Sequence, residues 1–190
     1  LNFFSFILLG ISASALGMLF FAVIGLVFPD PLDLTSQYAR NSAMSAIHYS
    51  IAALLISFPL YFFAMRLWFR QFREDEGRIE SRLSRWLTYI VLLITAVTLV
   101  GDAITVIFTL LQGEISLRFF LKAFTILVIA GSIFGFYYFE RKKIQYRVDI
   151  PRSFFLYFGR GITLLIGIGV VLGFIVGGSP SQQRQLTFDQ

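Results

Sequence analysis

The chain has 190 residues, of which 57% are hydrophobic and only 14% are charged, and its mean hydropathy is +0.77. This composition excludes an ordinary soluble domain, and the absence of cysteine excludes disulfides, thiolate metal ligands and thiol redox chemistry. The net charge of +5 does not indicate a nucleic-acid partner, because the basic residues flank the apolar runs. The expected counter-charges are the headgroups of a lipid bilayer.

Five apolar runs follow one another along the chain, each at least as long as the roughly 20 residues that a helix needs to cross a bilayer. The runs are apolar on all faces, which favours helices over the alternating strands of a barrel. We predict an all-α, polytopic transmembrane helical bundle that forms a single domain over residues 1–180. The five spans are expected at about residues 3–28, 42–66, 86–111, 118–139 and 154–177. Residues 181–190 are polar and are expected to form an extracytoplasmic tail, the truncated start of a linker.

Basic residues are concentrated in two of the connecting segments, which predicts the orientation. The segment between the second and third spans carries Arg66, Arg70, Arg73, Arg78, Arg82 and Arg85, and the segment between the fourth and fifth carries Arg141, Lys142, Lys143, Arg147 and Arg152. Both should be cytoplasmic by the positive-inside rule. Five spans then predict a cytoplasmic N-terminus and an extracytoplasmic C-terminus.

Proline and glycine predict the shape and packing of the spans. Pro59 should kink or break the second span, because it lacks an N–H and its ring clashes with the preceding turn. Gly169, Gly173 and Gly177 recur every four residues, as do Gly131 and Gly135. This spacing lets helix backbones approach closely, so it predicts helix packing within the chain or with another chain.

Five short motifs resemble an uncharacterised bacterial family of multi-spanning membrane proteins, described as a domain of unknown function. They are Ser57-Phe58-Pro59, Arg85-Trp86-Leu87-Thr88-Tyr89, Leu111-Gln112-Gly113-Glu114, Arg118-Phe119-Phe120-Leu121-Lys122 and Phe136-Tyr137-Tyr138. The resemblance covers roughly residues 45 to 140. It implies that the polar tail leads into a further domain, and it implies no particular reaction or ligand.

Polar residues in the third span are the first candidates for a functional site. They are Thr88, Thr95, Thr98, Asp102, Thr105 and Thr109, and their spacing predicts a single helical stripe. The stripe is expected to be a packing seam, since threonine in a span usually bonds to a carbonyl one turn earlier or to a neighbouring helix. The alternative is a polar pathway. Asp102 favours that alternative, because a carboxylate inside the membrane costs about 2.5–3.5 kcal/mol on insertion scales.

Lys122 is the expected partner of Asp102. If the chain turns near Gly113, the two residues lie at nearly the same depth in antiparallel neighbouring helices. Arg118 is a second candidate, although Glu114 is placed four residues before it. We predict an intramembrane ion pair between Asp102 and Lys122; the alternatives are a proton or cation site at Asp102 and a water-exposed Asp102.

The catalytic search predicts no enzyme. His48 is the only histidine, and the zinc-protease, serine-hydrolase and nucleotide-binding motifs are absent. No metal or cofactor is expected. We therefore expect a non-catalytic integral membrane module that anchors an extracytoplasmic C-terminal extension or packs as a subunit of a membrane assembly, with other membrane proteins or a homo-oligomer as partners. The alternative is a small ion or solute transporter or channel that uses the threonine stripe and Asp102.

Overall fold

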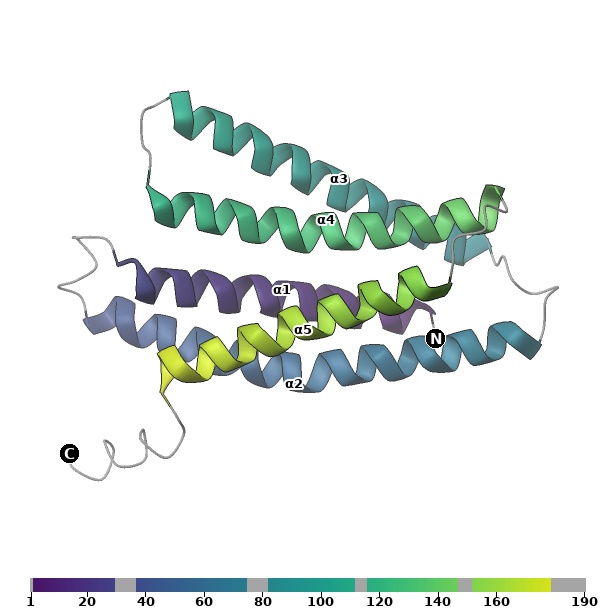
Figure 1. Cartoon of the computed structure of the whole chain (residues 1–190), viewed down its shortest axis with the longest axis horizontal. Coiled ribbons are helices and arrows are strands. Elements are labelled where there is room, and N and C mark those ends of the chain that lie inside the picture. Colours follow the sequence, from purple (N-terminus) through teal and green to yellow (C-terminus); the bar gives the residue numbers. More distant parts are fainter. Residues whose placement is uncertain (1, 30–36, 75–81, 112–115, 147–151, 179–190) are drawn as a thin grey trace.

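The computed structural model describes residues 2–29, 37–74, 82–111, 116–146 and 152–178, and this part of the chain is all-α. Its helices are α1 (Asn2–Val27), α2 (Gln37–Glu74), α3 (Arg82–Leu111), α4 (Leu117–Tyr146) and α5 (Arg152–Gly177). Consecutive helices run in opposite directions (Figure 1). Each contains a stretch of 22 to 28 residues that is long and apolar enough to cross a membrane. The prediction of five such helices is confirmed.

The second helix departs most from its expected bounds. It was expected over residues 42–66, and α2 extends at both ends, to Gln37 and Glu74. The extension after Arg66 is rich in Arg, Gln and Glu, which are good helix formers once the apolar part has nucleated the helix. Of the kink or break expected at Pro59, the break does not occur, since α2 is continuous there, and the kink stays a prediction. Buried residues before and after Pro59, among them Leu54 and Ala64, hold both halves of the helix in place.

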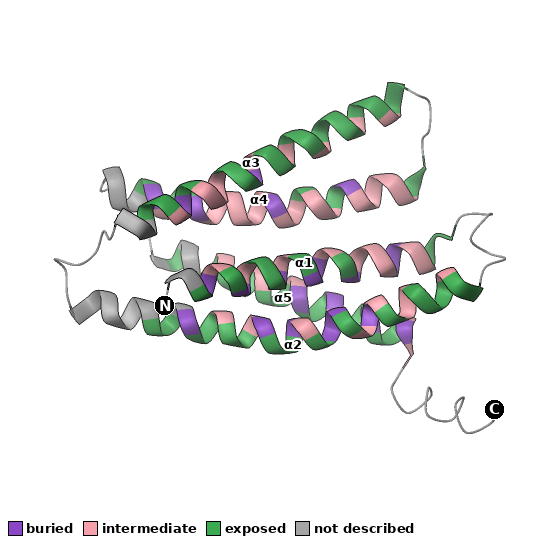
Figure 2. Ribbon diagram, turned by 180° about the vertical axis from the view of Figure 1, so that it is seen from behind, coloured by how far each residue is buried: buried purple, intermediate pink, exposed green. Residues whose placement is uncertain are grey.

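Helix α1 is the centre of the bundle. It makes its largest contact with α2 and also packs against α4 and α5, while α2 packs against α5. Within the described ranges α3 has one substantial neighbour, α4. In the most apolar stretch of α1, 39% of the residues are buried, against 6% in that of α3. Figure 2 shows the difference: α3 is coloured mostly as exposed, whereas α1 and α2 carry more buried positions.

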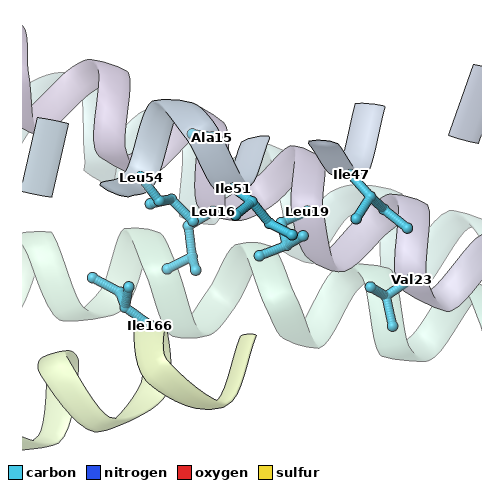
Figure 3. Packing of buried hydrophobic residues seen from close by; sticks show 8 residues of the cluster. All are labelled: Ala15, Leu16, Leu19, Val23, Ile47, Ile51, Leu54 and Ile166. Carbon is cyan, nitrogen blue, oxygen red and sulfur yellow. The ribbon is translucent and has the colours of Figure 1, made fainter. Parts of the chain in front are cut away.

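The contact between α1 and α2 combines an apolar core with buried serines. Leu19 and Ile47 are fully buried and Leu54 nearly so, and Figure 3 shows Leu19 beside Ile51 in this cluster. The buried residues recur every three or four positions on both helices, which is typical of a left-handed helix pair. The hydroxyls of Ser12 and Ser57 form a buried hydrogen bond of 2.8 Å across this contact.

The glycine face of α5 packs against this pair. A Cβ on Gly173 would lie 2.9 Å from Cδ1 of Leu19 and 3.0 Å from Cδ1 of Ile51, and one on Gly177 would lie 3.0 Å from Cγ2 of Ile47. Gly169 faces Phe20 and Leu19 in the same way. In contrast, nothing lies within 4 Å of a Cβ on Gly131 or Gly135, so that pair makes no close helix contact with the described residues. Gly178 follows α5 with a φ of 76°, the left-handed conformation that commonly ends a helix.

The two ends of the bundle differ. At one end, which we call the closed end, aromatic residues of the other four helices contact the second half of α4. Phe6 and Tyr61 contact Tyr137, Tyr89 lies against Arg141, and Phe158 stacks on Phe136. At the opposite, open end, α3 diverges from α4 as it approaches Leu111 (Figures 1 and 2). The outer surface of α3 is therefore exposed along most of its length.

Candidate functional site

The polar residues of α3 lie on two faces of the helix. Thr88 and Thr95 are buried, and Asp102 and Thr109 are half-buried; these four recur every seven residues. Together with the half-buried Leu92, Leu99 and Val106 they form the seam that faces α4, the one substantial neighbour of α3. Thr98 and Thr105 are exposed and lie beside the seam. The predicted single stripe is thus divided between a packed face and an open face.

The threonine hydroxyls are directed to the backbone of their own helix. Thr95 donates to the carbonyl of Val91 at 2.8 Å, with Leu92 as a second acceptor at 3.1 Å. Thr98 donates to Ile94 and Thr105 to Gly101, both at 2.8 Å. A hydroxyl proton used in this way is not available to a ligand, so these three residues present only acceptor lone pairs to their surroundings.

Asp102 lies in the second half of α3, which ends at the open end of the bundle. Its carboxylate is half-buried, about 14 Å from the end of α3 at Leu111, and it makes no hydrogen bond or ion pair with another described residue. The structure therefore does not bring it together with Lys122. The divergence of α3 from α4 gives the physical reason, because equal depth in neighbouring helices produces contact only while the helices stay side by side (Figure 1).

The two basic residues near the start of α4 are turned toward α1. The amine of Lys122 lies 5.5 Å from the centroid of the Phe21 ring, within the range of a cation–π interaction. A guanidinium nitrogen of Arg118 lies 3.6 Å from the position that a Cβ on Gly25 would occupy, which places Arg118 against α1 at van der Waals distance. Both residues make further interactions within the protein. Their positive charges serve the contact between α1 and α4.

The closed end contains a polar cluster that the sequence pattern did not indicate. The hydroxyls of Tyr61 and Tyr137 share a hydrogen bond, and the Tyr137 ring stacks on Phe6 with centroids 5.5 Å apart. The guanidinium of Arg141 is buried 5.1 Å from the centroid of the Tyr89 ring. The charge pattern of the sequence indicated for Arg141 only a role in orientation. The four-residue spacing of Tyr137 and Arg141, which puts both on one helix face, was the available signal.

The remaining candidates form no reaction centre. His48 is half-buried on α2, and Arg160 is exposed on α5, with its guanidinium 6.0 Å from the centroid of the Tyr157 ring. In the part of the chain that the structure describes, no three of His, Cys, Asp and Glu are grouped so as to hold a metal ion. The expected tail at residues 181–190 lies outside the described residues.

The comparisons with known proteins give a family and no function. Neither a curated protein nor a solved structure matches the chain. The family model described as domain of unknown function DUF5671 matches residues 1–137. The match reaches further toward the N-terminus than the resemblance seen over residues 45 to 140, and it spans α1, α2, α3 and α4 as far as Tyr137. The chain belongs to the DUF5671 family.

Proposed function

We propose that this chain is a non-catalytic integral membrane module that packs as a subunit of a larger membrane assembly, with α3 as the helix that meets the partner. It would have five spans in a bacterial cytoplasmic membrane, with its N-terminus on the cytoplasmic side. The observation that carries the proposal is the one-sided packing of α3, which among the described residues has a single substantial neighbour and no partner for the Asp102 carboxylate.

Lipid alone is a poor neighbour for this helix. Lipid tails can cover the exposed Val97, Val100 and Ile104, but they offer no hydrogen bond or counter-charge to Asp102. Ionisable residues in spans nearly always face a protein interior or a water-filled cavity. A second protein on α3 would supply such an interior, and the rest of the bundle would keep its own core between α1, α2 and α5.

The transporter alternative has a narrower basis. It is supported by Asp102 and the half-buried Thr109, which lie in the second half of α3, toward the open end. The back-bonded hydroxyls of Thr95, Thr98 and Thr105 weigh against a hydroxyl-lined path for an ion. A cation flux through liposomes that contain only this protein, lost in Asp102→Asn, would favour transport over assembly.

Photocross-linking in native membranes tests the assembly proposal. A photoreactive amino acid at Val97 or Ile104, both exposed on α3, should form a covalent product with another polypeptide. The matched control is Leu164, an equally exposed position on α5, which should react with lipid. If positions on α3 also react only with lipid, the proposal is contradicted.

A further inference from the structure

We propose that the polar edge of α3, defined as Thr98, Asp102 and Thr105, binds a transmembrane helix of a different membrane protein that carries a lysine or arginine at the depth of Asp102. The inference rests on the proposed function and adds the chemistry of the partner. It depends on three features: the position of these residues on α3, the lack of a partner for the Asp102 carboxylate among the described residues, and the contacts that Arg118 and Lys122 make with α1.

The polar edge is a continuous strip on an open helix. Thr98 precedes Asp102 by four residues and Thr105 follows it by three, so the three side chains lie one above the other on one side of α3. Both threonines are exposed, and Asp102 is half-buried because it belongs to the seam that faces α4 as well as to this strip. A helix lying against this strip would contact all three and would also cover part of the exposed apolar surface of α3. Threonine side chains are small enough to allow close helix packing.

The Asp102 carboxylate selects a cationic partner. It makes no hydrogen bond or ion pair within the described part of the chain, and the neighbouring hydroxyls of Thr98 and Thr105 donate to the carbonyls of Ile94 and Gly101 instead. The strip therefore presents acceptors only. A lysine or arginine brings several donors and the opposite charge, which is the complement that an acceptor-only site with a carboxylate requires.

A second copy of this chain does not bring such a cation. Arg118 and Lys122, at the start of α4, are turned toward Gly25 and Phe21 of α1, and each makes a further interaction within the protein. Arg40 lies only about 5 Å from the start of α2, whereas Asp102 is about 14 Å from the end of α3 at the same side of the bundle. Charge complementarity therefore points to a different protein.

A synthetic helix tests this chemistry directly. The full chain, labelled with a fluorescent donor, is placed in nanodiscs of phosphatidylethanolamine and phosphatidylglycerol with an acceptor-labelled Leu/Ala helix. This helix carries one lysine at the depth of Asp102, and matched helices carry leucine or glutamate at that position. Energy transfer should show about tenfold tighter association of the lysine helix than of the leucine helix. Asp102→Asn should remove the preference, and Asp102→Lys should transfer it to the glutamate helix.

Two controls separate the alternatives. Leu164→Asn adds a polar group at an equally exposed position on α5, away from the strip, and should leave the lysine preference unchanged. Equal association of the lysine and leucine helices with the native chain would overturn the inference, as would a homodimer of the native chain that Asp102→Asn dissolves. If Ile104 cross-links to a protein in native membranes but the lysine and leucine helices associate equally, the cationic partner is rejected and the assembly proposal stands. A lysine preference without any such cross-link would instead reject the assembly proposal.

Discussion

The side-chain oxygens of Ser12 and Ser57 lie 2.8 Å apart in the buried contact between α1 and α2. Ser50, seven residues before Ser57 on α2, is also fully buried, but its hydroxyl has no hydrogen-bond partner among the described residues. Two serines of the same helix face thus have opposite energetic roles. A satisfied hydroxyl stabilises the helix pair, and an unsatisfied one carries the cost of its desolvation.

The serine contrast predicts opposite effects of one substitution. Ser57→Ala should lower the free energy of unfolding by about 0.5–1 kcal/mol, because it leaves Ser12 without its partner in an apolar surrounding. Ser50→Ala removes an unsatisfied hydroxyl and should be neutral or stabilising by up to about 1 kcal/mol. Denaturation in mild detergent, followed by a folding-sensitive fluorescence signal, would compare the two. Equal destabilisation by both substitutions would contradict this assignment.

The glycine face of α5 predicts a position-dependent effect of added volume. Gly173→Leu should destabilise the bundle by about 1–3 kcal/mol, because a Cβ there already meets Leu19 and Ile51 at 2.9 and 3.0 Å. Gly167→Leu is the matched control on the same helix, since nothing lies within 4 Å of its Cβ. The thermal stability of the purified variants in detergent measures the difference. A Gly167 variant as unstable as the Gly173 variant would argue against packing of the glycine face.

The tyrosine pair at the closed end predicts strong coupling. Tyr61→Phe should cost about 1 kcal/mol, because the buried hydroxyl of Tyr137 loses its hydrogen bond. Adding Tyr137→Phe should cost little more, since both hydroxyls are then gone. A double-mutant cycle of unfolding free energies measures this coupling. Strictly additive effects would show that the hydrogen bond contributes nothing to stability.

Asp102→Asn should leave the isolated chain at least as stable as the native one. The substitution keeps the size of the side chain and removes a charge that has no partner among the described residues. Folded yield and thermal stability in detergent provide the measurement. The exchange of Asp102→Lys with Lys122→Asp serves as the control. A loss of yield in Asp102→Asn that the exchange restores would establish the ion pair expected from the sequence.

The orientation can be tested without removing any native cysteine, because the chain has none. Ser36→Cys should react with a membrane-impermeant maleimide added to intact cells, whereas Glu76→Cys should react only after the cells are opened. The reason is the excess of arginine around Glu76, which the positive-inside rule assigns to the cytoplasm. Labelling of the Glu76 variant in intact cells would reverse the proposed orientation.

Helix number and type followed from the sequence because each apolar run carries its own signal. The close approach at Gly173 was also readable, since four-residue glycine spacing is a local property of one helix. The seven-residue spacing of Ser5 with Ser12 and of Ser50 with Ser57 is a similar local signal for the contact between α1 and α2. The positions of charged residues do not indicate this contact.

The neighbours of Asp102 could not be inferred in the same way. Pairing it with Lys122 required α3 and α4 to remain side by side along their whole length, and nothing within either helix determines where two helices separate. The direction of Lys122 depends on Phe21, which is about a hundred residues away in sequence. Helix separation and long-range side-chain contacts are properties of the assembled bundle, so a residue pattern in α3 predicts polar positions but not their surroundings.

The central place of α1 has a consequence for biogenesis. Of the five helices α1 is the earliest to leave the ribosome, yet its packing surface is completed only by α4 and α5. The hairpin of α1 and α2 can form as soon as both helices are inserted. The surface that packs against Gly173 then stays accessible to lipid or to a chaperone until α5 is made, which requires the synthesis of more than 70 further residues. Translation that stalls between α2 and α5 would therefore leave in the bilayer a helix pair with an uncovered packing surface. Such a species is a suitable substrate for membrane proteases.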